Sequence, residues 1–203
     1  NNVNQPADLT TNKYDIDGDK INDEVYEISN AGQLYWFAGL VNGTLSGVPQ
    51  NTSANAVLTK DIVVNENVLK PDGTLNEGSF KEWTPIATSA SPYTGIFEGQ
   101  NHTISGLYFK QENTSEVGFF GYNGGKISNV GILNSYFCGF SRVGGVCGYN
   151  SSTITNCYNK GVVDGTADAA GSFGGVCGCN LGILTNCYNT GIVKGQSFVG
   201  GVS

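Results

Sequence analysis

The sequence predicts an all-β fold, a parallel β-helix whose N-terminal end is covered by one amphipathic helix. Two observations predict the solenoid: a phrase of twenty residues recurs, and each copy divides into short apolar segments. Residues 144–163 (GGVCGYNSSTITNCYNKGVV) return as residues 174–193 (GGVCGCNLGILTNCYNTGIV), with 13 of 20 positions identical. Because each coil of a solenoid contacts only its neighbours, every residue slot must suit the slots above and below it, and the sequence repeats.

The repeat has a basic period of about 26 residues. Residues 199–202 (VGGV) follow residues 173–176 (FGGV) by 26 positions, whereas the two copies quoted above are 30 positions apart. The excess of four lies within residues 166–172 (TADAAGS), where the neighbouring copies have a short corner. We therefore expect one coil to carry a loop insertion there, since loops accept insertions more readily than strands do.

Each copy contains three short apolar segments separated by Gly, Asn and Ser, at residues 143–149, 153–158 and 161–164. Segments of this length that are rich in Val, Ile, Thr and Tyr are typical of strands. No helical periodicity follows residue 45, and the Leu ladder of a leucine-rich repeat is missing. The sequence therefore predicts three strands per coil and five or six coils from about residue 57 onward.

The chain is expected to divide into three parts. Residues 1–25 form a leader with an acidic loop, residues 26–56 form an N-terminal cap, and residues 57–203 form the β-helix. The final residues (FVGGVS) begin a further copy of the repeat, so we expect the β-helix to be truncated at its C-terminus.

The cap is expected to contain the only helix, at residues 30–41. Asn30 can cap its N-terminus. One apolar face runs along it, and an amphipathic helix placed at an open solenoid end covers the core and blocks end-to-end association. We therefore expect a monomer. The residues of the apolar face are Leu34, Phe37, Ala38 and Val41.

Composition excludes two classes of partner. The chain has 10 Lys and Arg against 17 Asp and Glu, a net charge of −7 and a pI near 4.5. Nucleic acids and anionic membrane surfaces require clustered basic side chains, so neither is expected to bind. No stretch of about 18 apolar residues occurs, so we expect no membrane insertion. Residues 1–14 lack the positive start and apolar run of a secretory signal.

The acidic loop DIDGDKINDE (15–24) is the one site-like cluster. Asp15, Asp17, Asp19 and Asp23 occupy positions 1, 3, 5 and 9, with the carbonyl of Ile21 at position 7, an arrangement that lays an oxygen cage for Ca²⁺ along the chain. Position 12 lacks the bidentate Glu of an EF-hand. The loop resembles the DxDGDxxxD calcium loops of exported repeat proteins, and Ca²⁺ is the one cofactor expected. The alternative is a solvated acidic turn.

The six cysteines invite a disulfide framework, but the alignment of the copies favours free thiols. One slot holds Phe120, Cys147 and Cys177, and another holds Val130, Cys157 and Cys187. Because an apolar residue takes the same slot in another coil, Cys acts there as a small buried hydrophobe. We expect these four thiols to be buried and unbridged. We expect no metal site at the cysteines, since no C-x₂-C pair accompanies a second pair.

The aromatic residues near the N-terminus and the single histidine each allow a structural and a functional interpretation. A cluster of aromatic residues forms either part of the core, which we expect, or a sugar-stacking platform. His102, the sole histidine, is expected to serve a turn, because no Ser-His-Asp or Cys-His arrangement can be argued from the spacing. The aromatic residues are Tyr35, Trp36, Trp83 and Tyr93.

Residues 95–203 resemble the GLUG-repeat family of bacterial surface proteins, named for a Gly-Leu-any-Gly core. The resemblance is carried by FEGQNHTISGLYF (97–109), VGFFGYNGGKISNVGI (117–132) and the two copies quoted above, although Val146 and Val176 replace the eponymous Leu. The runs YEISNAGQLYWFAGLVNG (26–43) and LTKDIVVN (58–65) resemble the segment that precedes such repeats. The resemblance implies a right-handed β-helix on an exported protein, often attached to a cell surface and sometimes accompanying peptidase domains.

These observations favour a non-enzymatic exported module, located at the bacterial cell surface or secreted. We expect an adhesin or a stalk-like β-helix that presents or spaces other domains. Glycans or proteins of a host or matrix are its expected partners. The alternative is a carbohydrate-binding or carbohydrate-active β-helix of the lyase or hydrolase kind, which requires paired carboxylates or a Ca²⁺ cluster with a base. Asp164 aligns with Cys138 and Lys194, so no slot of the repeats stacks carboxylates, and we expect no catalytic residues.

Overall fold

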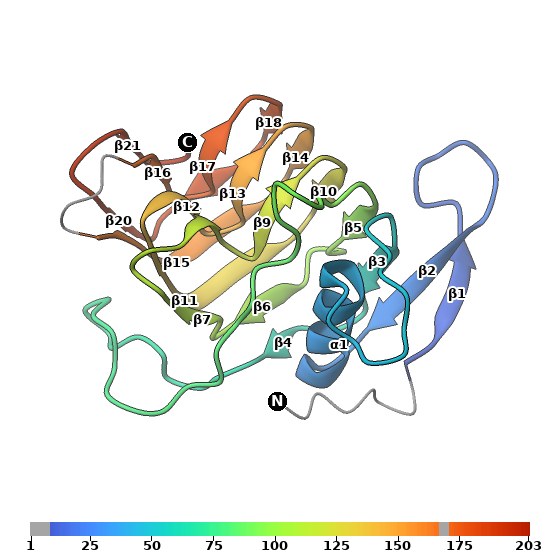
Figure 1. Cartoon of the computed structure of the whole chain (residues 1–203), viewed down its shortest axis with the longest axis horizontal. Coiled ribbons are helices and arrows are strands. Elements are labelled where there is room, and N and C mark those ends of the chain that lie inside the picture. The colour runs from blue at the N-terminus through green and yellow to red at the C-terminus, as the bar shows by residue number, and fades with distance from the viewer. Residues whose placement is uncertain (1–8, 167–170) are drawn as a thin grey trace.

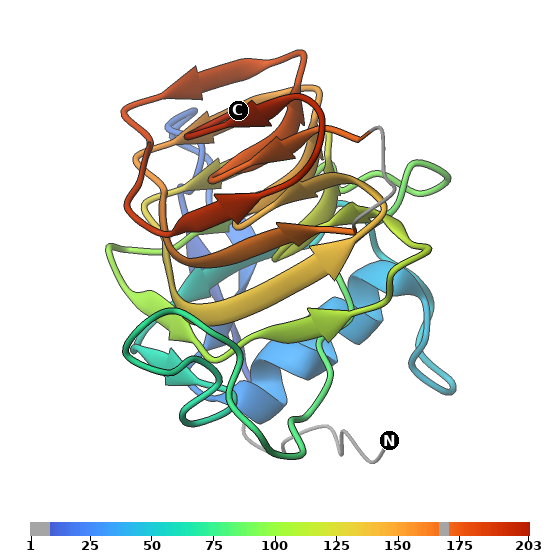
Figure 2. The same ribbon diagram turned by 90° about the vertical axis from the view of Figure 1, so that its left-hand side faces the viewer.

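Parallel strands stacked in four sheets build the molecule, which confirms the predicted all-β solenoid (Figure 1). The computed structural model describes residues 9–166 and 171–203. The coils stack from α1 (Ala31–Asn42) at one end to the C-terminal strands at the other (Figure 2). The helix therefore covers the N-terminal end of the solenoid, the position predicted for it.

Two seven-stranded sheets, A and B, form the longest faces. In sheet A only β1 is antiparallel to its neighbour. Sheet A contains β1 (Thr11–Tyr14), β2 (Asp23–Ile28), β3 (Asn55–Leu58), β5 (Ile96–Glu98), β10 (Lys126–Ser128), β14 (Thr153–Thr155) and β18 (Ile183–Thr185). Sheet B contains β4 (Ile62–Val63), β6 (Thr103–Ser105), β7 (Tyr108–Lys110), β11 (Gly131–Gly139), β15 (Tyr158–Gly165), β19 (Tyr188–Asn189) and β20 (Ile192–Lys194).

Two smaller sheets complete the coil. Sheet C contains β9 (Phe120–Asn123), β13 (Cys147–Asn150) and β17 (Cys177–Asn180), and sheet D contains β8 (Ser115–Val117), β12 (Ser141–Gly144), β16 (Phe173–Gly174) and β21 (Val199–Gly200). Each later coil thus contributes to four sheets, and the expectation of three strands per coil was wrong. The segment 143–149, read as one strand, is divided between β12 and β13. A side chain at Gly145 would collide with Asn159 and with the carbonyl of Gly175, so glycine permits the corner that divides it.

The strand register confirms the repeat. In sheet D, Val117 pairs with Val143, Val143 with Phe173, and Phe173 with Val199, so the spacing is 26, 30 and again 26 residues. Most of the expected insertion, residues 167–170, lies outside the described residues. Sheet A has five parallel strands from Asn55 onward, in agreement with five or six coils. Because β2 also pairs in parallel with β3, the sheet begins within the segments expected to be leader and cap.

The interior is filled by the inward-facing residues of all coils. Along sheet A the fully buried Ala56, Phe97, Ile127 and Ile154 follow one another in register. Burying one Phe or Ile side chain is worth about 1.5–3 kcal/mol, so this continuous row is a main source of stability. The row ends at Leu184 in β18, which is only partly buried.

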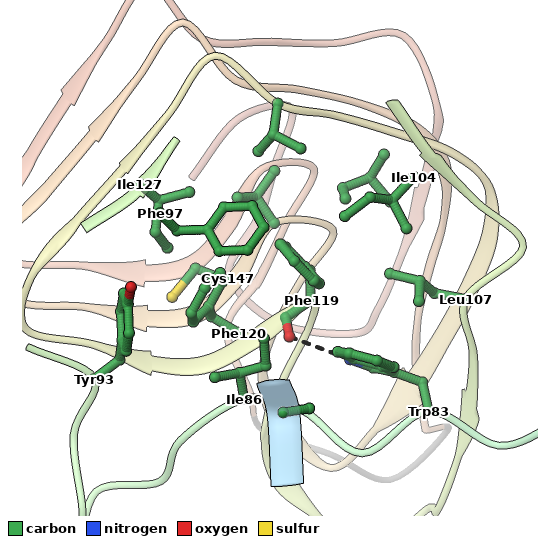
Figure 3. Packing of buried hydrophobic residues seen from close by; sticks show 14 of the residues in the cluster. Trp83, Ile86, Tyr93, Phe97, Ile104, Leu107, Phe119, Phe120, Ile127 and Cys147 are labelled. Carbon is green, nitrogen blue, oxygen red and sulfur yellow. Dashed lines mark hydrogen bonds between the residues drawn. The ribbon is translucent and has the colours of Figure 1, made fainter. Parts of the chain in front are cut away.

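An aromatic cluster occupies the wide N-terminal part of the core (Figure 3). Trp83 is fully buried and its Nε1 donates to the carbonyl of Phe119 at 3.1 Å, and the hydroxyl of Tyr93 donates to the carbonyl of Ala54 at 2.8 Å. Trp36 is 4% exposed. Trp36, Trp83 and Tyr93 are therefore confirmed as core residues, whereas Tyr35 is only partly buried: its ring packs edge-on against Trp83, and Lys81 lies 3.9 Å from its ring centroid.

Helix α1 begins and ends with side-chain and backbone caps. Asn30 accepts a hydrogen bond from the amide of Gln33 at 3.0 Å, and Gln33 in turn accepts from the amide of Ser29 at 2.7 Å, a reciprocal cap. Gly43 ends the helix in the left-handed conformation with φ of 68°. The buried face is wider than predicted because Leu45 and Val48, in the loop after the helix, pack against the same core.

Asparagine ladders hold the register between coils. Nδ2 of Asn123 donates to Oδ1 of Asn150, and Nδ2 of Asn150 donates to Oδ1 of Asn180, both at 2.7 Å. Asn156 and Asn186 occupy equivalent left-handed corners with φ of 55° and 52°. Asn tolerates this conformation better than most residues, which explains its recurrence at the corner.

The long segment between β4 and β5 covers the outward face of sheet B. Val68, from this segment, packs in a second small core with Tyr136 and Val162 of sheet B. The hydroxyl of Tyr136 donates to Asp164 at 2.7 Å. In sheet A, the hairpin β1–β2 forms one edge of the sheet and pairs with β3. None of the helices in the described ranges has the length and apolar character needed to span a membrane.

Candidate functional site

The acidic loop connects β1 to β2, which pair as an antiparallel hairpin from Tyr14 and Asp23 outward. Its carboxylates fold the loop by accepting backbone amides. Asp15 accepts from Gly18 at 2.8 Å and from Lys20 at 3.0 Å, and Asp19 accepts from Ile21 at 2.7 Å. Gly18 and Lys20 adopt positive φ, 88° and 71°, which turns the chain back on itself.

The loop brings three of the predicted ligands together. One carboxylate oxygen from each of Asp15, Asp17 and Asp19 lies within 4.8 Å of the other two. Asp23 is not part of this group: it begins β2, and its Oδ2 is buried without a hydrogen-bond partner among the described residues. The side chain of Ile21 is 67% exposed.

Three convergent carboxylates suit a hard cation. Ca²⁺ takes 6–8 oxygen ligands, and carboxylates, backbone carbonyls and water are the usual sources. Asp15, Asp17 and Asp19 are exposed, so water can supply the rest of the shell. No imidazole or thiolate belongs to the group, and zinc or copper, which prefer those ligands, fit the site less well.

A groove of about 190 Å³ adjoins the loop, on the outward face of sheet A. Its carboxylates are Asp15 and Glu98. The groove was not predicted, because its walls come from the leader, from β3 and from β5. Val57 and Glu98 pair directly in the sheet although 41 positions separate them. The lining residues are Tyr14, Asp15, Ile16, Val57, Glu98 and Gln100.

The side chain of Glu98 is held by four hydrogen bonds. Oε1 accepts from the amide of Gln100 at 2.7 Å, Oε2 accepts from the hydroxyl of Ser128 at 2.7 Å, and Asn129 donates to both oxygens at 3.0 Å. On the hairpin, the hydroxyl of Tyr14 donates to Glu27, and this bond raises the pKa of Tyr14. The polar groups around the groove are therefore fixed before any ligand arrives.

His102 lies in the turn after β5, as predicted, but it has a partner that the sequence did not indicate. Its Nδ1 lies 3.3 Å from Oδ1 of Asp61, which also accepts from the amide of Thr103 at 2.8 Å. The Thr103 bond, followed by the bond to His102, lowers the pKa of Asp61. Asp61 is 66% exposed, so the pair is a surface contact rather than an enclosed catalytic dyad.

All six cysteines are free. Cys147 and Cys177 are fully buried and pair in register, and burial raises the pKa of the Cys147 thiol. Cys157 is fully buried, but Cys187 is half-buried, contrary to the prediction, because it belongs to the last complete coil. A hydrogen bond from the Cys157 thiol lowers the pKa of Cys187 to about 7.

Tyrosines of successive coils form two stacked pairs at the surface, in which Tyr188 is exposed and the other three rings are partly buried. The rings of Tyr122 and Tyr149 stack with centroids 4.6 Å apart, and those of Tyr158 and Tyr188 stack at 4.9 Å. Stacking on the neighbouring coil covers one face of each ring, which reduces the area open to a sugar. Arg142 lies over the ring of Tyr149 at 5.4 Å and pairs with Glu116 at 2.7 Å.

Comparison with known proteins supports the fold and the repeat. The model of the GLUG motif matches residues 141–164, which form one coil from β12 to β15. Halomucin from Haloquadratum walsbyi is 33% identical over 119 residues, which are 56% of this chain but 1% of halomucin.

A crystal structure from Bacteroides ovatus, described as a proposed immunoglobulin A1 protease, is similar with a TM-score of 0.54 and 19% sequence identity. The match covers 86% of this chain and 63% of that one, so this chain spans only part of each protein that it matches. At this identity the likeness shows the fold alone. The resemblance drawn from the sequence is confirmed: the chain is a β-helix that carries the GLUG motif.

Proposed function

We propose that this chain is a non-enzymatic exported module, an adhesin or stalk-like segment that acts as a monomer at the cell surface and presents or spaces other domains. The observation that carries the proposal is where the repeated residues lie. Residues identical in the two copies, such as Cys147, Asn150 and Cys157, are buried and contact the next coil. The repeat thus maintains stacking, which a spacer needs and an active site does not.

The carboxylates of the coils support the same proposal. Asp164 pairs in register with Cys138 and Lys194, so the described part of residues 117–203 stacks no two carboxylates on successive coils. Hydrolysis of a glycoside requires two carboxyl groups about 5–10 Å apart. Asp168 lies outside the described residues. The name of halomucin, a mucin, is consistent with an extracellular location.

Turnover assays test the proposal directly. Purified chain is incubated with acidic and neutral polysaccharides and with an unstructured protein, with and without Ca²⁺, and new reducing ends and new amino termini are measured. We expect no product above the buffer control. Depolymerisation that disappears in Asp164→Asn or Glu98→Gln would overturn the proposal in favour of a lyase or hydrolase, and new amino termini would favour a peptidase. Antibody labelling of intact native cells tests the location.

We also propose that the acidic loop binds one Ca²⁺ through Asp15, Asp17, Asp19, Asp23 and the carbonyl of Ile21. The convergence of three carboxylates within 4.8 Å supports the proposal. Asp23 would join by a small movement at the end of β2, and a ligand there would satisfy its buried Oδ2.

Calorimetry with millimolar Ca²⁺ tests this loop. We expect one site in the wild-type chain and its loss in Asp17→Ala, which removes a ligand without touching the hairpin ladder. Asp72→Ala, in an exposed turn far along the chain, is the matched control and should bind as the wild type does. An absence of heat in the wild type, or unchanged binding in Asp17→Ala, would show that the loop is a solvated turn.

A further inference from the structure

The groove beside the acidic loop combines two fixed carboxylates with apolar surface. Tyr14 and Ile16 supply the accessible apolar atoms over the buried Val57, and Asp15 and Glu98 supply the charges. With a volume of about 190 Å³, it is smaller than the ~300–1,000 Å³ of most small-molecule pockets. A groove of this size accepts a single ring-sized unit rather than an extended chain.

The charge of the groove is not compensated from within the chain. Both oxygens of Glu98 accept hydrogen bonds from Gln100, Ser128 and Asn129, and all of these donors are neutral. Asp15 likewise accepts only backbone amides. Over residues 9–166 and 171–203, the ion pairs are His102 with Asp61 and Arg142 with Glu116, so neither groove carboxylate pairs with a basic side chain. A cationic ligand complements this charge, and an anionic one is repelled.

We propose that the groove binds the amino-sugar unit of a glycan, a pyranose ring that carries a free ammonium group. The C–H face of the ring would pack against Ile16 and the Tyr14 ring, and the ammonium would lie between Asp15 and Glu98. The inference goes beyond the proposed module role, since it assigns a ligand class, and it requires no bound metal.

The side chain of Gln100 favours a sugar over a basic protein side chain. It is exposed, lines the groove and offers an amide donor and an acceptor, which suit ring hydroxyls. The head group of Lys or Arg only donates, and the amide acceptor adds little beside two carboxylates. Loss of this side chain should therefore weaken binding of a sugar and leave binding of a basic peptide unchanged.

Calorimetry with two matched hexasaccharides tests the proposal. One is built of glucosamine and the other of N-acetylglucosamine, so they differ in charge but share the ring and its linkage. The chain is titrated at low ionic strength, below the pKa of the amines, with EDTA to keep divalent ions from the acidic loop. We expect the glucosamine hexasaccharide to bind at least tenfold more tightly, and added salt to weaken it.

Two variants and one control locate the binding. Glu98→Gln removes the charge while retaining the shape, and should weaken the glucosamine hexasaccharide at least tenfold. Gln100→Ala should weaken it severalfold. Glu112→Gln makes the same charge change at an exposed position outside the groove and should bind as the wild type does. Thermal melts of all variants check the fold.

Three results would overturn the inference. Equal binding of the two hexasaccharides would show that the ammonium is not recognised. Equal weakening of binding in Glu98→Gln and Glu112→Gln would show that the ligand does not bind in the groove. If oligolysine of the same charge binds as tightly and competes with the glucosamine hexasaccharide, the groove recognises positive charge and not the sugar ring. Glycan binding without turnover would agree with the non-enzymatic role. Turnover without binding in the groove would contradict the non-enzymatic role, and loss of the groove inference would leave that role untouched. The two proposals can therefore be tested separately.

Discussion

Cys187 shows how stacking alters the chemistry of a single residue. Its slot is occupied by Val130 and Cys157 in the preceding coils, yet its thiol is the one with a lowered pKa. The cause is local: the Cys157 thiol donates to it, and the backbone amide of Cys157 lies 3.4 Å from its Sγ. Both donors stabilise the thiolate. The same residue type in the same slot therefore has a raised pKa in one coil and a lowered pKa in the next.

We expect Cys187 to be the thiol most readily alkylated in the folded chain. Because the thiolate is the nucleophile, its reaction with iodoacetamide should rise with pH around a midpoint of about 7. Cys157→Val, which restores the residue type of an earlier coil, removes the donor and should move the midpoint toward the usual value of 9.0. Peptide mass spectrometry after timed labelling measures this.

Cys147 and Cys177 provide the internal control. Both are fully buried, so they should stay unlabelled until the chain is denatured. An unchanged midpoint in Cys157→Val, or labelling of Cys177 at the rate of Cys187, would show that hydrogen bonding does not set this reactivity.

At the scale of the element, α1 caps the N-terminal end of the solenoid core. Its aromatic residues face the core, where Phe37 contacts Tyr93 with ring centroids 6.4 Å apart and Phe97 at 6.0 Å. The helix therefore extends the solenoid core beyond the first strands of sheet A. At its N-terminus, the side chain of Asn30 accepts a hydrogen bond from the amide of Gln33.

Asn30→Ala should lower stability by about 1 kcal/mol, the usual cost of losing an N-cap. In a chain of this size that corresponds to about 2–4 °C in Tm. Asn113→Ala, at an exposed position without side-chain hydrogen bonds in the described structure, is the control and should stay within about 0.5 kcal/mol of the wild type. Urea melts followed by circular dichroism measure both. Equal stability of the two variants would mean that packing alone holds the helix.

At the scale of the whole molecule, the chain behaves as a stack in which each coil depends on its neighbours. Val146 illustrates this: its carbonyl accepts from the amide of Phe120 at 2.9 Å, and its amide donates to the carbonyl of Val176 at 2.9 Å. It is fully buried. Damage at this position therefore reaches the coils on both sides.

Val146→Asp should unfold the coils around residue 146, because an unpaired buried carboxylate costs several kcal/mol. Hydrogen exchange should show lost protection from β9 to β17, while α1 and β3 remain protected. Val63→Asp, at a position that is 57% exposed, is the control and should retain the wild-type pattern. Uniform loss of protection in Val146→Asp would indicate a single cooperative unit, and unchanged protection would mean that the core tolerates the charge.

The open C-terminal coil contrasts with the capped N-terminal one. Six large apolar side chains of the last coil are exposed, and none of the described elements covers them. Because β18 and β19 are the last strands of their sheets, Leu184 and Cys187 are only partly buried, in slots that are fully buried one coil earlier. The six residues are Leu181, Ile183, Tyr188, Ile192, Phe198 and Val199.

The sequence by itself determined the parallel β-helix, its 26-residue period, the helix behind Asn30 and the free thiols. All of these follow from nearest-neighbour stacking: when Phe120, Cys147 and Cys177 share a slot, their common environment can be read from their spacing. The spacing of Asp15, Asp17 and Asp19 indicated correctly that their carboxylates converge, because these residues are neighbours in the chain, whereas Asp23 lies outside the group. The corner at Gly145 was not predicted, since a break between two short strands leaves no periodic signal, and the partial burial of Cys187 was not predicted either.

Tertiary structure alone decided which residues meet outside the repeat. Glu98 lies beside Tyr14 and Asp15 because the β1–β2 hairpin adds to the edge of sheet A, and His102 meets Asp61 across a coil enlarged by the segment that covers sheet B. These contacts join stretches of irregular spacing, so no register relates them in the sequence. The groove that we propose as a binding site is therefore a product of how the leader packs on the solenoid, whereas the solenoid follows from the repeat.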